Sequence, residues 1–329
     1  MKIEIGNLKA EEGSKVFGFI DVGNSPTTVY KIPLVICNGS HSGPTLCVLG
    51  GVHGLEYSGI EAVLRVIEEV NPEELSGVLL LVPAVNQASF EARTAFISPL
   101  DGLNLNRCFP GNPKGTMSYR VAHCLFTEVV SKADYLIDCH GGDLNQDYVG
   151  CNFVIISVSD KEEVNKAVRE MAACFNAKYV GRQGVFKGSK GETTGAGTTM
   201  MATKIYGIPS IFAETGKGGE VSESSVKFTY DGILNVMKHL GMIEGKAVRY
   251  EHIVDPEVFM CTAEKGGLFR SKVKVGGMVS AGDVVAEVVD LFGRPLQTVR
   301  ATTDSLVAGK RVFYAVNPGE FLVRLIKAE

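Results

Sequence analysis

The sequence predicts an α/β protein, in which helices lie on both faces of a mixed, largely parallel sheet, followed by a C-terminal all-β domain. Two short apolar runs, 45–49 and 77–83, are typical of strands that are buried on both faces. A helical pattern of apolar residues separates them, and a crossover of helix length implies that the two strands are parallel. From about residue 251, short apolar runs alternate with Gly, Pro and Asp, which favours β-structure. We therefore expect two domains, residues 1–245 and 251–329.

The composition is that of a globular protein with a small-molecule partner. A chain of 329 residues with 45% hydrophobic content can bury a large core. Its 33 basic and 37 acidic residues are balanced, and no Lys/Arg cluster is present that would attract nucleic acid or an anionic membrane. No apolar run approaches the length of a membrane helix, and no signal peptide is apparent. We expect a cytoplasmic protein, and a homo-oligomer is compatible with the sequence.

The eight cysteines are scattered without CxxC pairs, which suits a reducing compartment. We interpret most of them as small buried hydrophobic residues. Cys108 and Cys139 are exceptions of interest, because an arginine precedes the first and a histidine follows the second.

Ahead of the first buried run, residues 1–44 are predicted to form short strands with turns at 23–26 and 38–44. His41 lies in the second turn, where we expect a solvated loop histidine. The later elements continue the alternation of helix and strand and are predicted as a helix beginning at Ser118, a strand over 135–140, a strand over 153–158, a helix over 161–175, a strand over 208–213 and a helix over 226–240. A glycine-rich run over 181–197 lacks the ending of a phosphate-binding loop, and we expect it to border the active site.

One short stretch, residues 50–56, joins the run 45–49 to the helix that follows it. In open α/β sheets, ligands bind at the carboxyl ends of the strands. His53 is placed at such an end and Glu56 on the first helical turn, so that an imidazole nitrogen and a carboxylate can converge on one metal ion. The pattern alone also fits an ordinary helix start with an acidic first turn. A metal site therefore requires a third ligand.

Two further strand ends carry groups that complete such a site. The strand over 135–140 ends in His140, and the strand over 208–213 leads into Glu214. Two histidines and one carboxylate leave the fourth position of a zinc ion open for water, as in catalytic sites. Glu214 is then the candidate that accepts a proton from this water and passes it to a leaving amine. Asp138 either orients His140 or is an ordinary strand-end residue.

The long connection between about 85 and 117 supplies candidate substrate contacts. Connections of this length in compact domains are usually functional. Arg107 follows Asn106, and a guanidinium beside an amide is suited to holding a substrate carboxylate. Arg93 is suited to polarising a scissile carbonyl and stabilising the oxyanion that follows. Either arginine, taken singly, also fits a surface position.

Four motifs, in order along the chain, resemble those of the succinylglutamate desuccinylase/aspartoacylase family, relatives of the zinc carboxypeptidases. They occupy residues 51–56, 104–111, 138–141 and 214–216. The resemblance covers roughly residues 40–245 and implies a zinc carboxypeptidase-like fold for this domain. It also implies one zinc ion per chain, and the ligands that it implies are His53, Glu56 and His140.

The same resemblance implies the hydrolysis of an N-acyl amino acid. It implies Asn106 and Arg107 at the substrate carboxylate, Arg93 at the carbonyl and Glu214 as general base and acid. Gly141 and Gly142 differ from the polar run of aspartoacylase itself and are more similar to the branch that includes deacetylases of N-acetyl-diaminobutyrate.

The C-terminal region resembles the barrel-sandwich fold of lipoyl and biotinyl domains. Those carriers display a lysine at a hairpin tip, whereas the corresponding turn, 291–294, has none. We therefore expect this domain to act as a wall over the site or as an oligomer contact. The overall expectation is a zinc-dependent amidohydrolase that acts on carbon–nitrogen bonds other than peptide bonds. Two alternatives stay open, a zinc carboxypeptidase that acts on peptides and a non-catalytic protein that binds a metal or ligand.

Overall fold

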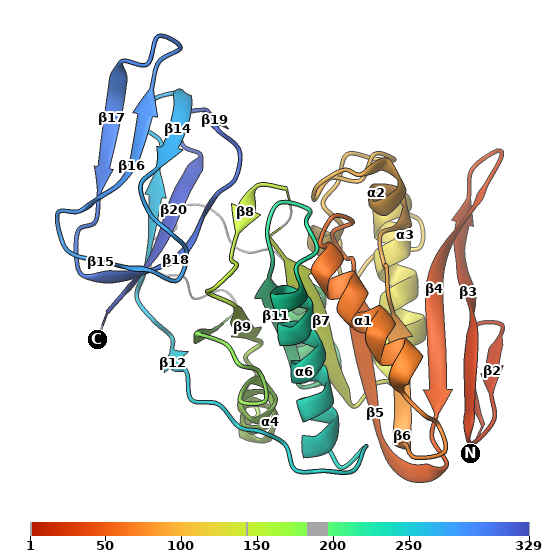
Figure 1. Cartoon of the computed structure of the whole chain (residues 1–329). Coiled ribbons are helices and arrows are strands. Elements are labelled where there is room, and N and C mark those ends of the chain that lie inside the picture. The colour runs from red at the N-terminus through yellow and green to blue at the C-terminus, as the bar shows by residue number, and fades with distance from the viewer. Residues whose placement is uncertain (1, 143, 183–196, 329) are drawn as a thin grey trace.

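The computed structural model describes residues 2–142, 144–182 and 197–328. A large sheet with helices on both faces forms the first part of the chain, and antiparallel strands form the C-terminal part (Figure 1). The sequence predicted this mixed α/β architecture. None of the helices in the described ranges is long and apolar enough to cross a membrane.

Within the described residues, nine strands form the large sheet. In spatial order they are β12 (Ile253–Val254), β10 (Tyr179–Arg182), β9 (Phe153–Ile156), β11 (Ser210–Thr215), β7 (Tyr135–Gly141), β5 (His41–Gly50), β6 (Ser76–Val82), β4 (Val29–Asn38) and β3 (Ser14–Asn24). The central strands β11, β7, β5 and β6 are parallel to one another. The pairs β6–β4, β4–β3 and β11–β9 are antiparallel. The carboxyl ends of β5, β7 and β11 therefore meet at one edge of the sheet, as predicted.

Helices cover both faces of this sheet. One face carries α1 (Tyr57–Glu69), α4 (Glu162–Ala172) and α6 (Glu223–His239). The other carries α3 (Met117–Cys124), its π-helical continuation η2 (Leu125–Val129), and the hairpin of β1 (Ile3–Ile5) and β2 (Leu8–Ala10). The other helical segments of the described ranges are short turns, namely α2 (Gln87–Ala92), η1 (Leu105–Arg107), η3 (Val130–Lys132), α5 (Thr198–Met201) and η4 (Ala202–Tyr206). In α1, Val63 and Val66 are fully buried, and each such side chain contributes about 1.5–3 kcal/mol.

Several elements begin or end away from their predicted bounds. β5 begins at His41, so this histidine starts a strand and does not lie in a turn, although it is exposed as expected. Only two residues join β4 to β5, and a Cβ on Gly39 would meet the carbonyl oxygen of Leu75 at 2.2 Å, so that this tight connection requires glycine. Helix α6 begins earlier than predicted, because Ser222 caps it by accepting from the backbone N–H of Ser225. Most of the glycine-rich run 181–197 lies outside the described residues.

Two antiparallel sheets form the C-terminal part. The first contains β13 (Val258–Thr262), β20 (Phe321–Lys327), β18 (Ser305–Arg311) and β15 (Met278–Val279). The second contains β17 (Pro295–Arg300), β16 (Val284–Val289), β14 (Gly267–Ser271) and β19 (Ala315–Val316). Their shared core includes Phe269, Val307 and Leu322. The predicted turn over 291–294 joins β16 to β17, with Leu291 91% exposed at its tip. The barrel-sandwich resemblance stays a prediction.

Strands cross between the two parts of the chain. β8 (Gln146–Asp147) follows the strand that carries His140, yet it pairs with β18 of the C-terminal sheet. Conversely, β12, which lies just before the C-terminal sheets in the sequence, pairs with β10 of the large sheet. The backbone N–H of Val312 also donates to the carbonyl of Asn145 at 3.1 Å. The loop after β7 is therefore anchored to the C-terminal sheet, and the division into 1–245 and 251–329 stays a prediction.

Candidate metal centre

The structure brings the three predicted metal ligands together at the carboxyl edge of the sheet. His53 lies in the loop after β5, Glu56 immediately precedes α1, and His140 lies in β7. All three are buried, with 8%, 4% and 3% of their surface exposed. One potential ligand atom from each lies within 4.8 Å of the others. This close approach follows from the parallel register, which sets Gly50 of β5 beside Cys139 of β7.

Two glycines shape the loop that carries His53. Gly51 has a φ of +64°, in the left-handed region that L side chains rarely adopt, and it turns the chain out of β5. A Cβ on Gly54 would meet the backbone nitrogen of Phe90 at 2.3 Å. Glycine at both positions therefore allows the loop to turn sharply and pack against α2, which fixes His53 above the end of the sheet.

Both histidines direct the same ring nitrogen at Glu56. His53 Nδ1 lies 2.8 Å from Glu56 Oε1, and His140 Nδ1 lies 2.9 Å from Glu56 Oε2. On the far side of each ring, Nε2 faces an oxygen acceptor. These acceptors are Asn104 Oδ1, at 3.2 Å from His53, and Asp138 Oδ2, at 3.3 Å from His140. Asn104 Oδ1 also accepts from the backbone N–H of Asn106 at 2.9 Å, which supports the assignment of its amide oxygen.

This arrangement fits a bound metal. An oxygen acceptor at Nε2 places the ring proton there and leaves the Nδ1 lone pair directed at the Glu56 carboxylate. Two lone pairs and a carboxylate repel one another unless a cation lies among them. Two imidazole nitrogens and one carboxylate, with acceptors behind the rings, are the donor set of catalytic zinc sites. The residues therefore suit zinc.

The electrostatics of the cluster also favour a cation. Burial alone raises the pKa of Glu56, but the charges of His53 and His140 outweigh burial and lower it to about 2. Burial lowers the pKa of His140, whereas Asp138 and Glu56 raise it well above its ordinary value, so the two carboxylates favour positive charge at this ring, which a metal ion would supply in place of the second ring proton. Glu56 is thus a carboxylate at neutral pH, as a metal ligand must be.

Glu214 lies beside this cluster. It belongs to β11, where its Cα is paired with that of His140 on β7 and with that of Phe153 on β9. Directly paired residues of neighbouring strands point to the same face of a sheet. Phe212, two residues earlier on the same face, places its ring 5.4 Å from that of His140. The register of the sheet therefore puts the Glu214 carboxylate next to the candidate metal ligands.

Asn106 and Arg107 form most of η1, and Asn104 caps this turn. Because Asn104 also contacts His53, the motif lies against the candidate metal centre. Asn106 Oδ1 accepts from the backbone N–H of Thr198 at 3.3 Å, and Arg107 is exposed, with Nη1 donating to the Asn106 carbonyl. The contact of Asn104 with His53 was not predicted; its position two residues before Asn106 within the motif was the available signal.

Arg93 is exposed at the protein surface. It ends α2 in a left-handed conformation, with φ +53°, and its side chain is exposed. A surface pocket of about 410 Å³ is lined by Arg93, Tyr57 and Phe90 among others. Within the described ranges, the structure gives no contact between Arg93 and the three candidate ligands. Phe96, further along the same loop, places its ring 5.7 Å from that of His53.

The two cysteines near the motifs are structural. Cys139 is fully buried in the core, and burial raises the pKa of its thiol well above the ordinary value. Burial likewise raises the pKa of Cys108 to about 11. The thiolate is the reactive and metal-binding form, so burial disfavours that form at both positions.

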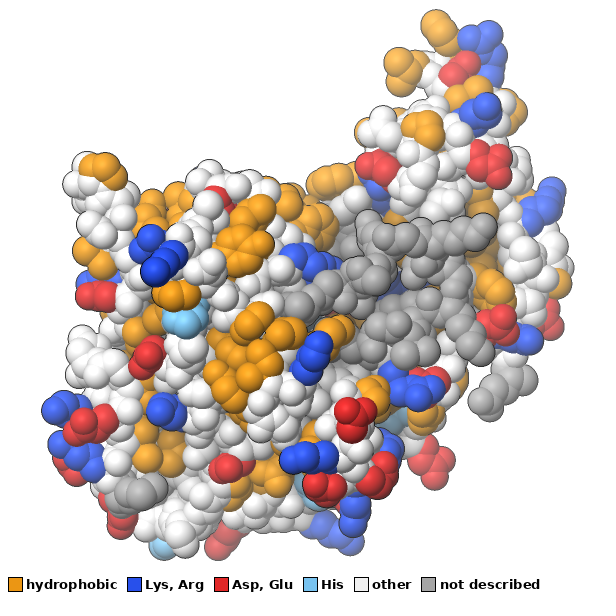
Figure 2. Space-filling view, turned by 180° about the vertical axis from the view of Figure 1, so that it is seen from behind, with side chains coloured by type: hydrophobic (Ala, Val, Ile, Leu, Met, Phe, Trp, Pro, Cys, Tyr) orange, Lys and Arg blue, Asp and Glu red, His pale blue; other side chains and the backbone are white. Residues whose placement is uncertain are grey.

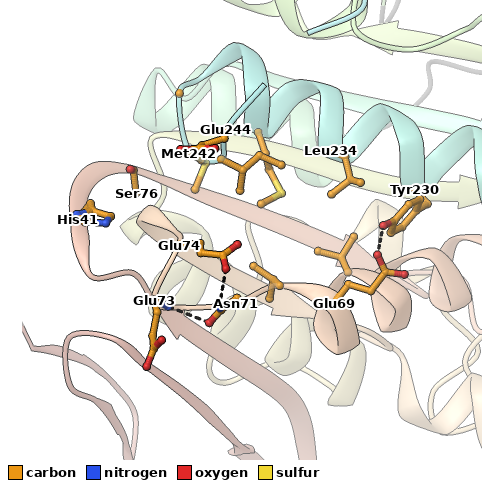
Figure 3. Close-up of a pocket in the computed structure, with 15 residues that line it drawn as sticks. His41, Glu69, Asn71, Glu73, Glu74, Ser76, Tyr230, Leu234, Met242 and Glu244 are labelled. Carbon is orange, nitrogen blue, oxygen red and sulfur yellow. Dashed lines mark hydrogen bonds between the residues drawn. The ribbon is translucent and has the colours of Figure 1, made fainter. Parts of the chain in front are cut away.

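A larger cavity, of about 860 Å³, lies at the opposite edge of the sheet (Figure 3). Its wall includes His41 and Ser76, which begin β5 and β6, whereas the metal ligands follow the carboxyl ends of the parallel strands. Tyr230 donates to Glu69 across the space between α6 and α1. This cavity is separate from the candidate metal centre. Among the described residues on the face shown in Figure 2, Lys and Arg are interspersed with Asp and Glu and form no broad basic patch.

Comparison with known proteins agrees with this geometry. Residues 42–240 match the model of the succinylglutamate desuccinylase/aspartoacylase catalytic domain. A relative from Halomonas elongata, N-alpha-acetyl-L-2,4-diaminobutyric acid deacetylase, is 30% identical over 84% of this chain and 80% of its own length.

Solved structures extend the similarity over nearly the whole chain. The product-bound ectoine utilization protein EutE (DoeB) from Ruegeria pomeroyi is 26% identical, with a TM-score of 0.86 and 98% of each chain covered. A succinylglutamate desuccinylase/aspartoacylase from Rhodobacter sphaeroides is 25% identical, with a TM-score of 0.84 and 99% of each chain covered. The matched catalytic domain spans more than half of the chain and contains all three candidate ligands. The protein therefore belongs to the succinylglutamate desuccinylase/aspartoacylase family.

Proposed function

We propose that this protein hydrolyses the amide bond of a small N-acyl amino acid with one zinc ion held by His53, Glu56 and His140. The observation that carries the proposal is the buried cluster in which both Nδ1 atoms face the Glu56 carboxylate and both Nε2 atoms face an oxygen acceptor. The name of the Halomonas elongata relative supports an N-acetyl amino acid as the first substrate class to test. A cytoplasmic location and a homo-oligomeric state stay predictions.

The residues around the cluster account for the steps of such a hydrolysis. Zinc, when bound, polarises the acyl carbonyl and lowers the pKa of a water molecule. Glu214 would accept a proton from the water that attacks the carbonyl carbon, and would later donate that proton to the nitrogen as the carbon–nitrogen bond breaks. The hydroxyl group of the water joins the acyl carbon to give a carboxylic acid. The proton joins the nitrogen to give a free amino acid.

Substrate contacts come from the motif next to His53. Asn106 and Arg107 bind the carboxylate of the amino acid, with the guanidinium providing a two-pronged contact. Arg93 stabilises the developing oxyanion. In the structure this arginine lies at the surface pocket, so this role requires its side chain to turn toward the ligands when substrate binds.

A carboxypeptidase with the same metal set is the second candidate. It needs an open cleft for a peptide, whereas β8, which follows the His140 strand, is paired with the C-terminal sheet beside the site. We infer that the C-terminal sheet restricts access to the site, which favours a small substrate. A binding protein without catalysis would retain zinc but would have no use for Glu214 beside the ligands.

A substrate panel separates these candidates. Zinc-loaded protein is incubated with N-acetyl, N-succinyl and N-formyl amino acids, including Nα-acetyl-2,4-diaminobutyric acid, and with C-terminal dipeptides. Released primary amine is measured. We expect release from one N-acyl class and none from the peptides. Cleavage of the peptides alone would establish the carboxypeptidase, and zinc-bound protein that releases no amine would contradict the proposed function.

A further inference from the structure

We propose that Arg324, on β20 of the C-terminal sheet, is a positioning residue for Glu214, holding its carboxylate in place beside the metal ligands. The inference rests on the proposed function, in which Glu214 transfers the proton. It gives the C-terminal part a defined task in the reaction, beyond covering the site.

Arg324 reaches out of its own sheet toward the large one. Its guanidinium carbon lies 5.2 Å from the ring centre of Tyr148 and 5.6 Å from that of Phe153. Both distances are within the range of a cation–π contact. The two rings contact each other edge to face, with centres 5.1 Å apart. Arg324 is therefore held on an aromatic platform made of Phe153, on β9 of the large sheet, and Tyr148, in the segment between β8 and β9.

This platform adjoins Glu214. Phe153 on β9 is the direct antiparallel partner of Glu214 on β11. Side chains of such a pair lie on the same face, with Cβ atoms about 4.5–5.5 Å apart. A guanidinium over the Phe153 ring is thus placed beside the Glu214 carboxylate, on the side away from His140. The electrostatics agree with this placement: burial lowers the pKa of Arg324, but its partners outweigh burial and raise it, and the Glu214 carboxylate is one of the groups that do so.

The C-terminal sheet is built to admit this contact. Arg324 is paired with Gly309 on β18. A Cβ at Gly309 would meet Tyr148 Cε1 at 2.6 Å, so the absence of a side chain leaves room for the tyrosine ring beside the arginine. The next two residues of β18, Lys310 and Arg311, pair with β8, which tethers the segment after β7 to the C-terminal sheet. The docking of the sheets therefore sets where the guanidinium lies.

The chemical consequence concerns the geometry of proton transfer. A carboxylate on a strand end has several rotamers, and a proton is transferred efficiently only from those that reach the water and the leaving nitrogen. A fixed cation on one side favours rotamers in which one oxygen faces the guanidinium and the other faces the metal site. A misplacement of about 1 Å costs up to about a hundredfold in rate, so loss of this cation lowers kcat.

The test compares Arg324→Met, which keeps an unbranched chain without charge, with Arg324→Lys, which keeps the cation. Arg300→Met is the matched control, since Arg300 is an exposed arginine of the same C-terminal part that donates to the Gly282 carbonyl. We expect Arg324→Met to lower kcat about ten- to hundredfold at a KM within about twofold of wild type and with zinc content unchanged. Arg324→Lys recovers part of kcat, and Arg300→Met retains it.

A double variant separates this inference from the proposed function. In the Glu214→Gln background, Arg324→Met should cause no further loss, because the arginine acts through Glu214. Two results would overturn the inference and leave the proposed function standing. One is that the two substitutions lower kcat by factors that multiply in the double variant. The other is that Arg324→Met keeps the kcat of wild type while Glu214→Gln loses activity. Thermal unfolding of wild type, Glu214→Gln, Arg324→Met and the double variant tests the contact without any substrate. The change in Tm of the double variant should differ from the sum of the changes in the two single variants. Additive shifts would overturn the contact even if the substrate class proved to be different.

Discussion

The acceptors behind the two histidine rings should control how tightly zinc is held. Replacing Asn104 with Leu removes the oxygen that lies 3.2 Å from His53 Nε2, while the length of the side chain is similar. Loss of such an acceptor typically weakens metal binding 10- to 100-fold, equivalent to about 1.4–2.7 kcal/mol. We place Asn104→Leu within this range, because the amide oxygen contacts the ring directly. Competition with a chelator of known zinc affinity measures the change.

Asn112→Leu is the matched control for this experiment. Asn112 also caps a local turn, with its side-chain oxygen accepting from the backbone N–H of Lys114 at 2.9 Å, but it is exposed. Asn112→Leu should leave the zinc affinity unchanged. Asn104→Asp, which keeps an oxygen acceptor, should have a zinc affinity close to that of wild type. Equal zinc affinity in Asn104→Leu and wild type would refute the inference that the Nε2 contact orients His53.

Three further predictions concern folding and reactivity. Gly54→Ala should lower the free energy of unfolding by about 1–3 kcal/mol, seen as a lower urea midpoint, because its Cβ would meet the Phe90 backbone at 2.3 Å. Burial opposes the ionisation of Asp101, but hydrogen bonds from the Ser118 backbone and hydroxyl outweigh it and lower the pKa. The ionised Asp101 therefore contributes about 1 kcal/mol to the free energy of unfolding above about pH 4, and this contribution is lost as the pH falls through the lowered pKa. Between pH 6 and about pH 3, the free energy of unfolding of Asp101→Asn should fall less than that of wild type. Cys108, with a pKa of about 11, should resist alkylation at pH 7 in the folded protein and react after unfolding, as mass spectrometry would show.

The predicted ligands came together because their positions depend on local rules. His53 follows a strand that is buried on both faces, and His140 ends another, so that parallel pairing alone brings them to one edge of the sheet. Glu56 was predicted on the first helical turn and lies immediately before α1, three residues after His53, so the helix start places it near the histidine. The alternation of apolar strands and amphipathic helices likewise predicted the mixed sheet.

Contacts that depend on tertiary register were not predictable in this way. The platform below Arg324 joins β20 to Tyr148 and Phe153, which lie far away along the chain, and no local pattern records that pairing. The pairing of β8 with the C-terminal sheet could not be predicted for the same reason. β8 is only two residues long, which is too short for a pattern of apolar residues to identify a strand. The early start of β5 at His41 reflects pairing with Ser76, which overrides the turn-forming residues around it.

The central claim is that His53, Glu56 and His140 hold one zinc ion that the hydrolysis requires. Its most direct test is to titrate zinc into metal-free protein while measuring the release of amine from Nα-acetyl-2,4-diaminobutyric acid, in wild type and in His140→Ala. We predict that turnover rises in proportion to bound zinc, reaches its maximum at one ion per chain, and is absent from His140→Ala, which also fails to retain the ion. Full turnover by metal-free protein, or by His140→Ala, would contradict the claim.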